Sequence, residues 1–151
     1  AKLFEAAARL GAVISHSTEK EEQAMAAYGR HLGTAFQLID DVFDYNSSPE
    51  ELGKNIGDDL AEGKPTLPLL YAMWHGNEAE TKIIQSAIEN GGLQNIDQIK
   101  AAIISTGAIS YTEKIAHEEA ELAINAIKDL PSSEHLDALK NLAKFSVTRQ
   151  Y

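Results

Sequence analysis

The sequence contains no cysteine, which excludes disulfide bonds, zinc–thiolate sites and cysteine nucleophiles. Cationic side chains are scarce too, because 13 Lys and Arg stand against 23 Asp and Glu, a formal net charge of −10. Nucleic acids and anionic membranes are bound through basic surfaces, so this balance disfavours both as partners. A membrane-spanning helix needs about 20 apolar residues, and the longest apolar run, LPLLYAMW, is short and contains a proline. We therefore expect a cytoplasmic protein with no transmembrane segment and no nucleic-acid partner.

The hydrophobic residues follow helical periodicity over most of the chain. At 151 residues and 44% hydrophobic content, the sequence is long enough for one domain with a core. We find no set of strand-like segments and no internal repeat. Helices are predicted over residues 2–14, 18–45, 65–76, 78–90, 95–106, 109–130 and 133–148. The sequence thus predicts a single all-α domain over residues 1–151.

Local signals mark where these helices begin and end. The second helix opens with the capping-box pattern Thr18-x-x-Glu21. The segment 46–65 interrupts the helical pattern with glycine, proline and clustered polar residues, so we predict a long loop with one helical turn after Ser48. Loops of this length inside compact domains are usually either functional or disordered.

Three carboxylates lie within the apolar helix segment FQLIDDVFDY, residues 36–45. At about 100° per residue, Gln37, Asp40, Asp41 and Asp44 fall within an arc of roughly 100°, and apolar residues fill the rest of the circumference. Neighbouring aspartates repel one another, and aspartate is a poor helix former, so a compensating ligand is expected. Mg²⁺ prefers such oxygen ligands and shares its remaining positions with water and phosphate oxygens. The alternative for the aspartates taken alone is a solvated acidic face.

Two lysines follow the acidic helix, and each comes directly after a glycine. These pairs are Gly53-Lys54 and Gly63-Lys64, with Asp59 between them. Lysine is a compact charge suited to phosphate, and glycine lets backbone N–H groups approach an anion closely. Carboxylates followed by two such pairs indicate a site for a metal-bound diphosphate.

The segment FQLIDDVFDY followed by GKNIGDDLAEGKPTLPLLYAM resembles the second aspartate-rich motif and downstream loop of trans-isoprenyl diphosphate synthases, most closely the bacterial long-chain, octaprenyl type. The resemblance runs from residue 1 to about Met73, and the later helices are similar only in general character. It implies a partial isoprenoid-synthase helical bundle. It also implies a prenyltransferase that condenses isopentenyl diphosphate sequentially onto an allylic diphosphate. The product would be a membrane-directed, long-chain polyprenyl diphosphate for the side chain of an isoprenoid quinone.

The same resemblance implies roles for individual residues. Mg²⁺ would be the cofactor, held by Asp40 and Asp41, with Asp44 as a further ligand. Catalytic positions would be Asp40, Asp41 and Lys54. Substrate-binding positions would be Gln37, Lys54, Asp59 and Lys64. Arg149, near the C-terminus, resembles the basic tail that some members fold over the site.

Several family features are missing from this sequence. The first aspartate-rich motif is absent, and the chain begins in mid-pattern, without Met or a helix cap. We therefore expect the C-terminal half of a longer enzyme, inactive alone, which by family likeness works as a homodimer. Two alternatives stay open: a non-catalytic partner subunit of a heteromeric prenyl synthase, and a terpene cyclase.

Overall fold

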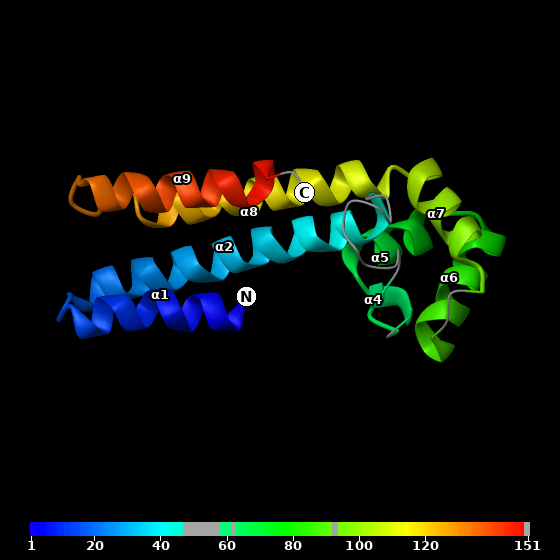
Figure 1. Ribbon diagram of the computed structural model, residues 1–151, viewed down its shortest axis with the longest axis horizontal. Coiled ribbons are helices and arrows are strands. Elements are labelled where there is room, and N and C mark those ends of the chain that lie inside the picture. Colours follow the sequence, from blue (N-terminus) through cyan, green and yellow to red (C-terminus); the bar gives the residue numbers. More distant parts are fainter. Residues whose placement is uncertain (47–57, 62, 92–93, 150–151) are drawn as a thin grey trace. The chain divides into compact units, whose positions relative to one another are not determined.

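The computed structural model describes residues 1–46, 58–61, 63–91 and 94–149 (Figure 1). Every regular element in these ranges is an α-helix, so the all-α prediction is confirmed. No helix among the described residues is both long and apolar enough to cross a membrane. The helices are α1 (Lys2–Ile14), α2 (Glu19–Asn46), α4 (Asp58–Ala61), α5 (Leu67–His75), α6 (Glu78–Asn90), α7 (Ile96–Ser105), α8 (Ala108–Ala126) and α9 (Glu134–Thr148).

The observed helix boundaries agree with the sequence signals except at α8 and α4. At the start of α2, Thr18 N–H donates to the Glu21 carboxylate at 2.7 Å, and Glu21 N–H donates to Thr18 Oγ1 at 3.4 Å, which confirms the capping box. The predicted helix 109–130 was too long, since α8 ends at Ala126. Tighter i→i−3 hydrogen bonds follow, because the chain must leave the helical region before Pro131. The short α4 was not predicted, and the predicted turn after Ser48 lies outside the described residues.

The backbone divides into two compact units, and α2 and α8 each pass from one unit into the other. The first unit comprises Ala1–Ile39 and Lys114–Gln150, and the second comprises Asp40–Glu113. The prediction of a single domain over 1–151 stays a prediction.

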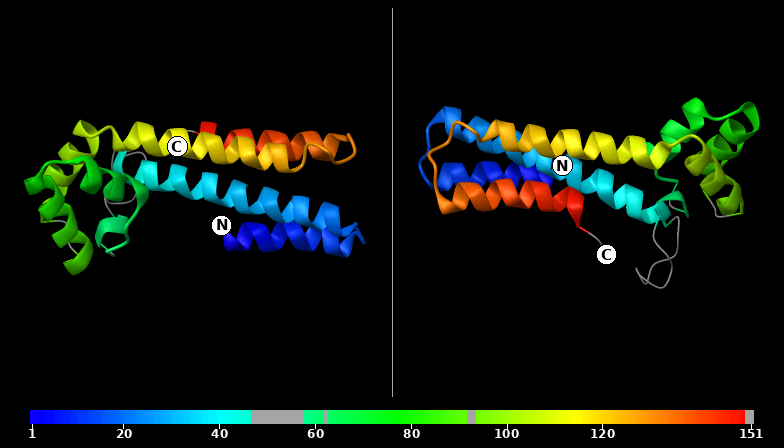
Figure 2. Two further views of the ribbon diagram at one scale, coloured as in Figure 1. Left: turned by 180° about the vertical axis from the view of Figure 1, so that it is seen from behind. Right: turned by 90° about the horizontal axis from the view of Figure 1, so that it is seen from above.

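In the first unit, α1 and α9 lie alongside the parts of α2 and α8 that belong to it (Figure 2). Their apolar faces meet in a buried cluster drawn from α2, α8, α9 and the turn after α8. The cluster comprises Tyr28, Leu32, Ala123, Ile127, Leu136 and Ala143. Burial of such side chains is the dominant favourable contribution to the stability of a helical bundle.

Two glycines in α2 let α1 approach closely. A Cβ on Gly33 would lie 2.8 Å from the Cα of Ala1, and one on Gly29 would meet the Phe4 carbonyl. Gly11 on α1 has no such neighbour within 4 Å. Glycine costs helix stability in itself, so its presence inside α2 is explained by the close packing of α1.

In the second unit, α5, α6 and α7 pack against one another, with the end of α2 and α4 contributing to the core. The buried residues include Tyr45, Leu60, Leu69, Ile84 and Ile99. Tyr45 comes from the last turn of α2, and Leu60 from α4. Tyr45 directly follows Asp44, and Leu60 directly follows Asp59, so the neighbours of two candidate site residues are anchored in the core of this unit.

Candidate functional site

The acidic end of α2 is only partly open to solvent. Asp41 is buried, with 6% of its surface exposed, whereas Asp40 and Asp44 are half-buried. Gln37, one turn before Asp41, is exposed and lies in the first unit. Burial of a carboxylate without a compensating cation is unfavourable, so the surroundings of Asp41 decide what this segment can bind.

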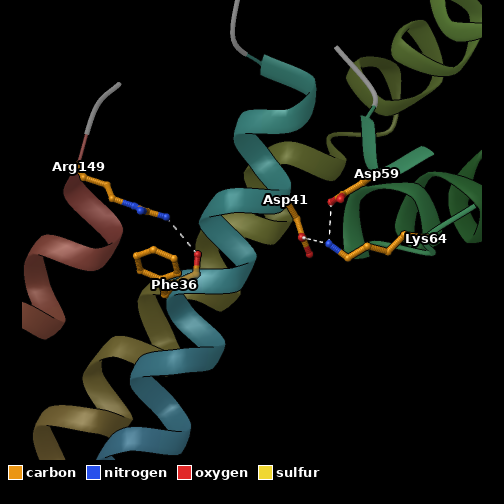
Figure 3. A network of polar contacts seen from close by, with 5 residues as sticks. All are labelled: Phe36, Asp41, Asp59, Lys64 and Arg149. Carbon is orange, nitrogen blue, oxygen red and sulfur yellow. Dashed lines mark hydrogen bonds and ion pairs between the residues drawn. The ribbon is translucent and has the colours of Figure 1, made fainter. Parts of the chain in front are cut away.

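Lys64 supplies the compensating charge. Its ammonium donates a hydrogen bond to Asp59 Oδ2 at 2.8 Å and lies 3.7 Å from Asp41 Oδ1 (Figure 3). The structure thus brings together three of the residues singled out in the sequence, from α2, α4 and the turn before α5. Lys54, the other lysine of the predicted site, lies outside the described residues.

The Lys64 pKa reflects opposing influences. Burial is the largest single effect and lowers the pKa, but the hydrogen bond to Asp59 and the charges of Asp41 and Asp59 together outweigh it. The net result is a pKa raised above the ordinary lysine value. Lys64 therefore keeps its positive charge at neutral pH.

Local backbone geometry explains why a glycine precedes Lys64. Gly63 has a φ of +68°, a conformation that side chains disfavour, and its N–H donates to the Leu60 carbonyl at 2.9 Å as α4 ends. The Lys64 N–H donates to the Asp59 carbonyl at 2.9 Å. The Gly-Lys pair thus ends a short helix and keeps the lysine next to the aspartate of that helix.

Sequence reasoning missed two buried hydroxyls beside this group. Tyr45 directly follows Asp44 and is 5% exposed, and Thr66 follows Lys64 by two residues and is 3% exposed. The only sequence signal was their position next to residues already singled out. Neither residue type is a preferred Mg²⁺ ligand, so a search for metal ligands passes over them.

Arg149 lies against α2 within the first unit. Its guanidinium carbon is 3.8 Å from the centroid of the Phe36 ring, and its Nη2 donates to the Phe36 carbonyl at 3.3 Å (Figure 3). This arrangement combines a cation–π contact with a hydrogen bond. It joins the C-terminal end of α9 to α2. That Arg149 corresponds to the basic tail that some family members fold over the site stays a prediction.

The donor chemistry of the acidic segment fits Mg²⁺. The ion accepts one or two protein carboxylates and fills its octahedral shell with water and substrate phosphate oxygens. Within the described ranges, no three Asp, Glu or His side chains converge closely enough to hold a metal ion on their own. Asp40, Asp41 and Asp44 are the oxygen donors of α2 that would hold such an ion.

The sequence and the fold of this chain are similar to those of proteins of known class. The polyprenyl synthetase family model matches residues 1–105, and this chain belongs to that family. It is 51% identical over 152 aligned residues to octaprenyl diphosphate synthase of Haemophilus influenzae, and 48% identical over 150 to that of Escherichia coli. The alignments cover 100% and 99% of this chain but 46% of each relative, so the chain spans about half the length of the curated relatives it matches.

Solved structures show the same fold. A polyprenyl synthase of Caulobacter crescentus, crystallised with calcium and isoprenyl diphosphate, matches with a TM-score of 0.89 at 38% identity. That match covers 100% of this chain and 47% of the other. A decaprenyl diphosphate synthase of Rhodobacter capsulatus matches with a TM-score of 0.85 at 35% identity, over 96% of this chain and 45% of the other. The expected isoprenoid-synthase type of helical fold is therefore confirmed for the part that this chain comprises.

Proposed function

We propose that this chain carries the second aspartate-rich half of the active site of an Mg²⁺-dependent trans-polyprenyl diphosphate synthase of the octaprenyl type. The reaction is the sequential condensation of isopentenyl diphosphate onto an allylic diphosphate. The observation that carries this proposal is the Lys64 ammonium, which lies beside both Asp41 and Asp59. The similarity to octaprenyl diphosphate synthases supports the same conclusion.

The acidic residues would hold the substrate through the metal. Asp40 and Asp41, with Asp44 as a further ligand, would bind Mg²⁺, which supplies Lewis-acid neutralisation of the diphosphate. Asp41 is fixed within the buried end of α2, so its carboxylate is preorganised for a ligand at that position. Gln37 would lie beside the growing prenyl chain.

The lysines would bind the charge that the metal leaves over. When a diphosphate arrives, Lys64 can donate to its oxygens as well as to Asp59, because an ammonium has three N–H donors. Lys54 would contact the allylic diphosphate. As the allylic C–O bond breaks and the isopentenyl double bond forms the new C–C bond, negative charge would accumulate on the departing diphosphate, where these ammonium groups would stabilise it. The condensed product would then lose a proton to that diphosphate, which restores a double bond.

Three further features belong to this proposal. We infer a homodimer, a cytoplasmic location and a product that partitions into membranes, on the basis of the resemblance and the composition. No observation on the described residues favours the alternatives of a non-catalytic partner subunit or a terpene cyclase.

Incorporation of isopentenyl diphosphate tests the proposed reaction. The chain is assayed by itself and mixed with a polypeptide that carries a first aspartate-rich motif, with radiolabelled isopentenyl diphosphate, an allylic diphosphate and Mg²⁺. We expect long-chain product only from the mixture, and none when Asp41→Asn replaces the unmodified chain. If Asp41→Asn supports the same rate as the unmodified chain, the assignment of Asp41 is wrong.

A further inference from the structure

The Lys64 ammonium is held differently by its two aspartates (Figure 3). It donates a hydrogen bond to Asp59 Oδ2 at 2.8 Å, whereas its distance to Asp41 Oδ1 is 3.7 Å, which is too long for a good hydrogen bond. All three residues belong to the second unit. Asp59 therefore fixes the position of the ammonium, and the ammonium acts on Asp41 through its charge.

A divalent cation bound to Asp41 would come close to that charge. Because Mg²⁺ lies about 2.0–2.1 Å from a carboxylate oxygen, an ion on either oxygen of Asp41 would be within about 6–8 Å of the Lys64 nitrogen in its present position. Asp41 is buried, which limits the screening of charges by water. The ammonium and a bare divalent cation would therefore repel each other.

A diphosphate reverses the sign of this interaction. Mg²⁺ fills the positions that carboxylates leave open with phosphate oxygens, and the resulting magnesium diphosphate carries a net negative charge. The Lys64 ammonium attracts such a complex and can donate hydrogen bonds to its oxygens while it keeps the bond to Asp59, because it has three N–H donors. One side chain thus has opposite effects on the metal alone and on the metal with its diphosphate.

We propose that Lys64 couples the two ligands of this site: its ammonium weakens the binding of a bare divalent cation at Asp41 and strengthens the binding of the same cation with a diphosphate. The identity of the second ligand rests on the proposed function. A lysine that served only to neutralise a buried aspartate would not produce this change of sign. The site would therefore fill with metal and diphosphate together rather than with metal first.

Binding of Mn²⁺ without diphosphate tests the repulsion in the full chain. Mn²⁺ takes the same oxygen ligands as Mg²⁺, and electron paramagnetic resonance measures its free concentration. At low ionic strength, we expect Lys64→Met and Lys64→Gln to bind Mn²⁺ about five- to tenfold more tightly than the unmodified chain. This factor is the repulsion between charges of +1 and +2 at about 6–8 Å in the dielectric of water. Lys64→Arg keeps the charge and should keep the weaker binding.

Lys82 provides the matched control for the loss of one positive charge. It lies in the same unit and pairs with Glu78 at 2.6 Å on the surface of α6, so Lys82→Met should leave the affinity for Mn²⁺ unchanged. The same variants are then titrated with inorganic pyrophosphate in the presence of Mn²⁺, where Lys64→Met should bind more weakly than the unmodified chain. Circular dichroism confirms that each variant is folded.

The two titrations separate this proposal from the proposed function. Equal Mn²⁺ affinities for the unmodified chain and the folded Lys64 variants, or an equal gain in Lys82→Met, would overturn the proposal. Tighter binding of both Mn²⁺ and manganese pyrophosphate by Lys64→Met would overturn it as well. If the unmodified chain binds no manganese pyrophosphate, the proposed function is wrong, and a gain for Mn²⁺ alone would uphold only the repulsion.

Discussion

Two glycines that lie in helices but differ in their surroundings allow a controlled test of the packing of α1 against α2. Gly11 on α1 has open space where a Cβ would be placed. At Gly29 on α2, a Cβ would lie 2.8 Å from the Cβ of Ala8 and 2.8 Å from the carbonyl carbon of Phe4. The same substitution by alanine should therefore have opposite effects at the two positions.

The magnitude follows from two contributions. Alanine in place of glycine stabilises an open helix position by about 1 kcal/mol. At Gly29 that gain is opposed by an overlap with backbone atoms, and overpacking of this kind costs about 1–3 kcal/mol. Because the helix gain is common to both sites, Gly29→Ala should be less stable than Gly11→Ala by about 1–3 kcal/mol.

Urea unfolding followed by circular dichroism measures the free energy of unfolding of each variant. In thermal unfolding of a chain of this size, 1 kcal/mol shifts the melting temperature by about 2–4 °C, so the melting temperatures of the two variants should also differ by several degrees. If Gly29→Ala is as stable as Gly11→Ala, α1 does not lie against α2 as described.

Two other predictions concern stability at high pH and exposed apolar surface. Burial raises the pKa of Tyr28 to about 12, so the folded state keeps this proton above the unfolded pKa of about 10. The resulting stability is fully present below about pH 10 and falls by about 1.4 kcal/mol per unit as pH rises toward 12. Tyr28→Phe should flatten that decline in urea titrations; parallel curves for the two proteins would contradict it. On α1, Leu3, Leu10 and Ile14 are 80%, 56% and 75% exposed, so the chain should bind a hydrophobic dye or self-associate; a strictly monomeric chain without dye binding would refute this.

The helices were predictable because their signals are local. Apolar periodicity defined α1, α2 and α6 closely, and the capping box at Thr18 marked the start of α2. The end of α8 was not predictable from Pro131, because tight turns precede the proline and occupy the last residues of the pattern. The four-residue α4 is too short to leave a periodic signal of its own.

The candidate site was predictable in its charges but not in its supporting contacts. Asp41, Asp59 and Lys64 were grouped by residue type and glycine spacing, and the structure brings them together. The burial of Tyr45 and Thr66 beside these charges depends on how the end of α2 and the start of α5 pack within the second unit. That packing is a tertiary property, which no pattern within either segment encodes.

The central claim, that Lys64 and the aspartates of α2 form one half of a magnesium–diphosphate site, is tested most directly by calorimetric titration with inorganic pyrophosphate in the presence of Mg²⁺. A hydrogen bond to a charged group contributes about 1.5–3 kcal/mol, so Lys64→Ala should weaken binding by about 10- to 100-fold. Lys82→Ala, which removes an exposed lysine from the same unit, should bind as the unmodified chain does. Equal affinities for Lys64→Ala and the unmodified chain would contradict the account.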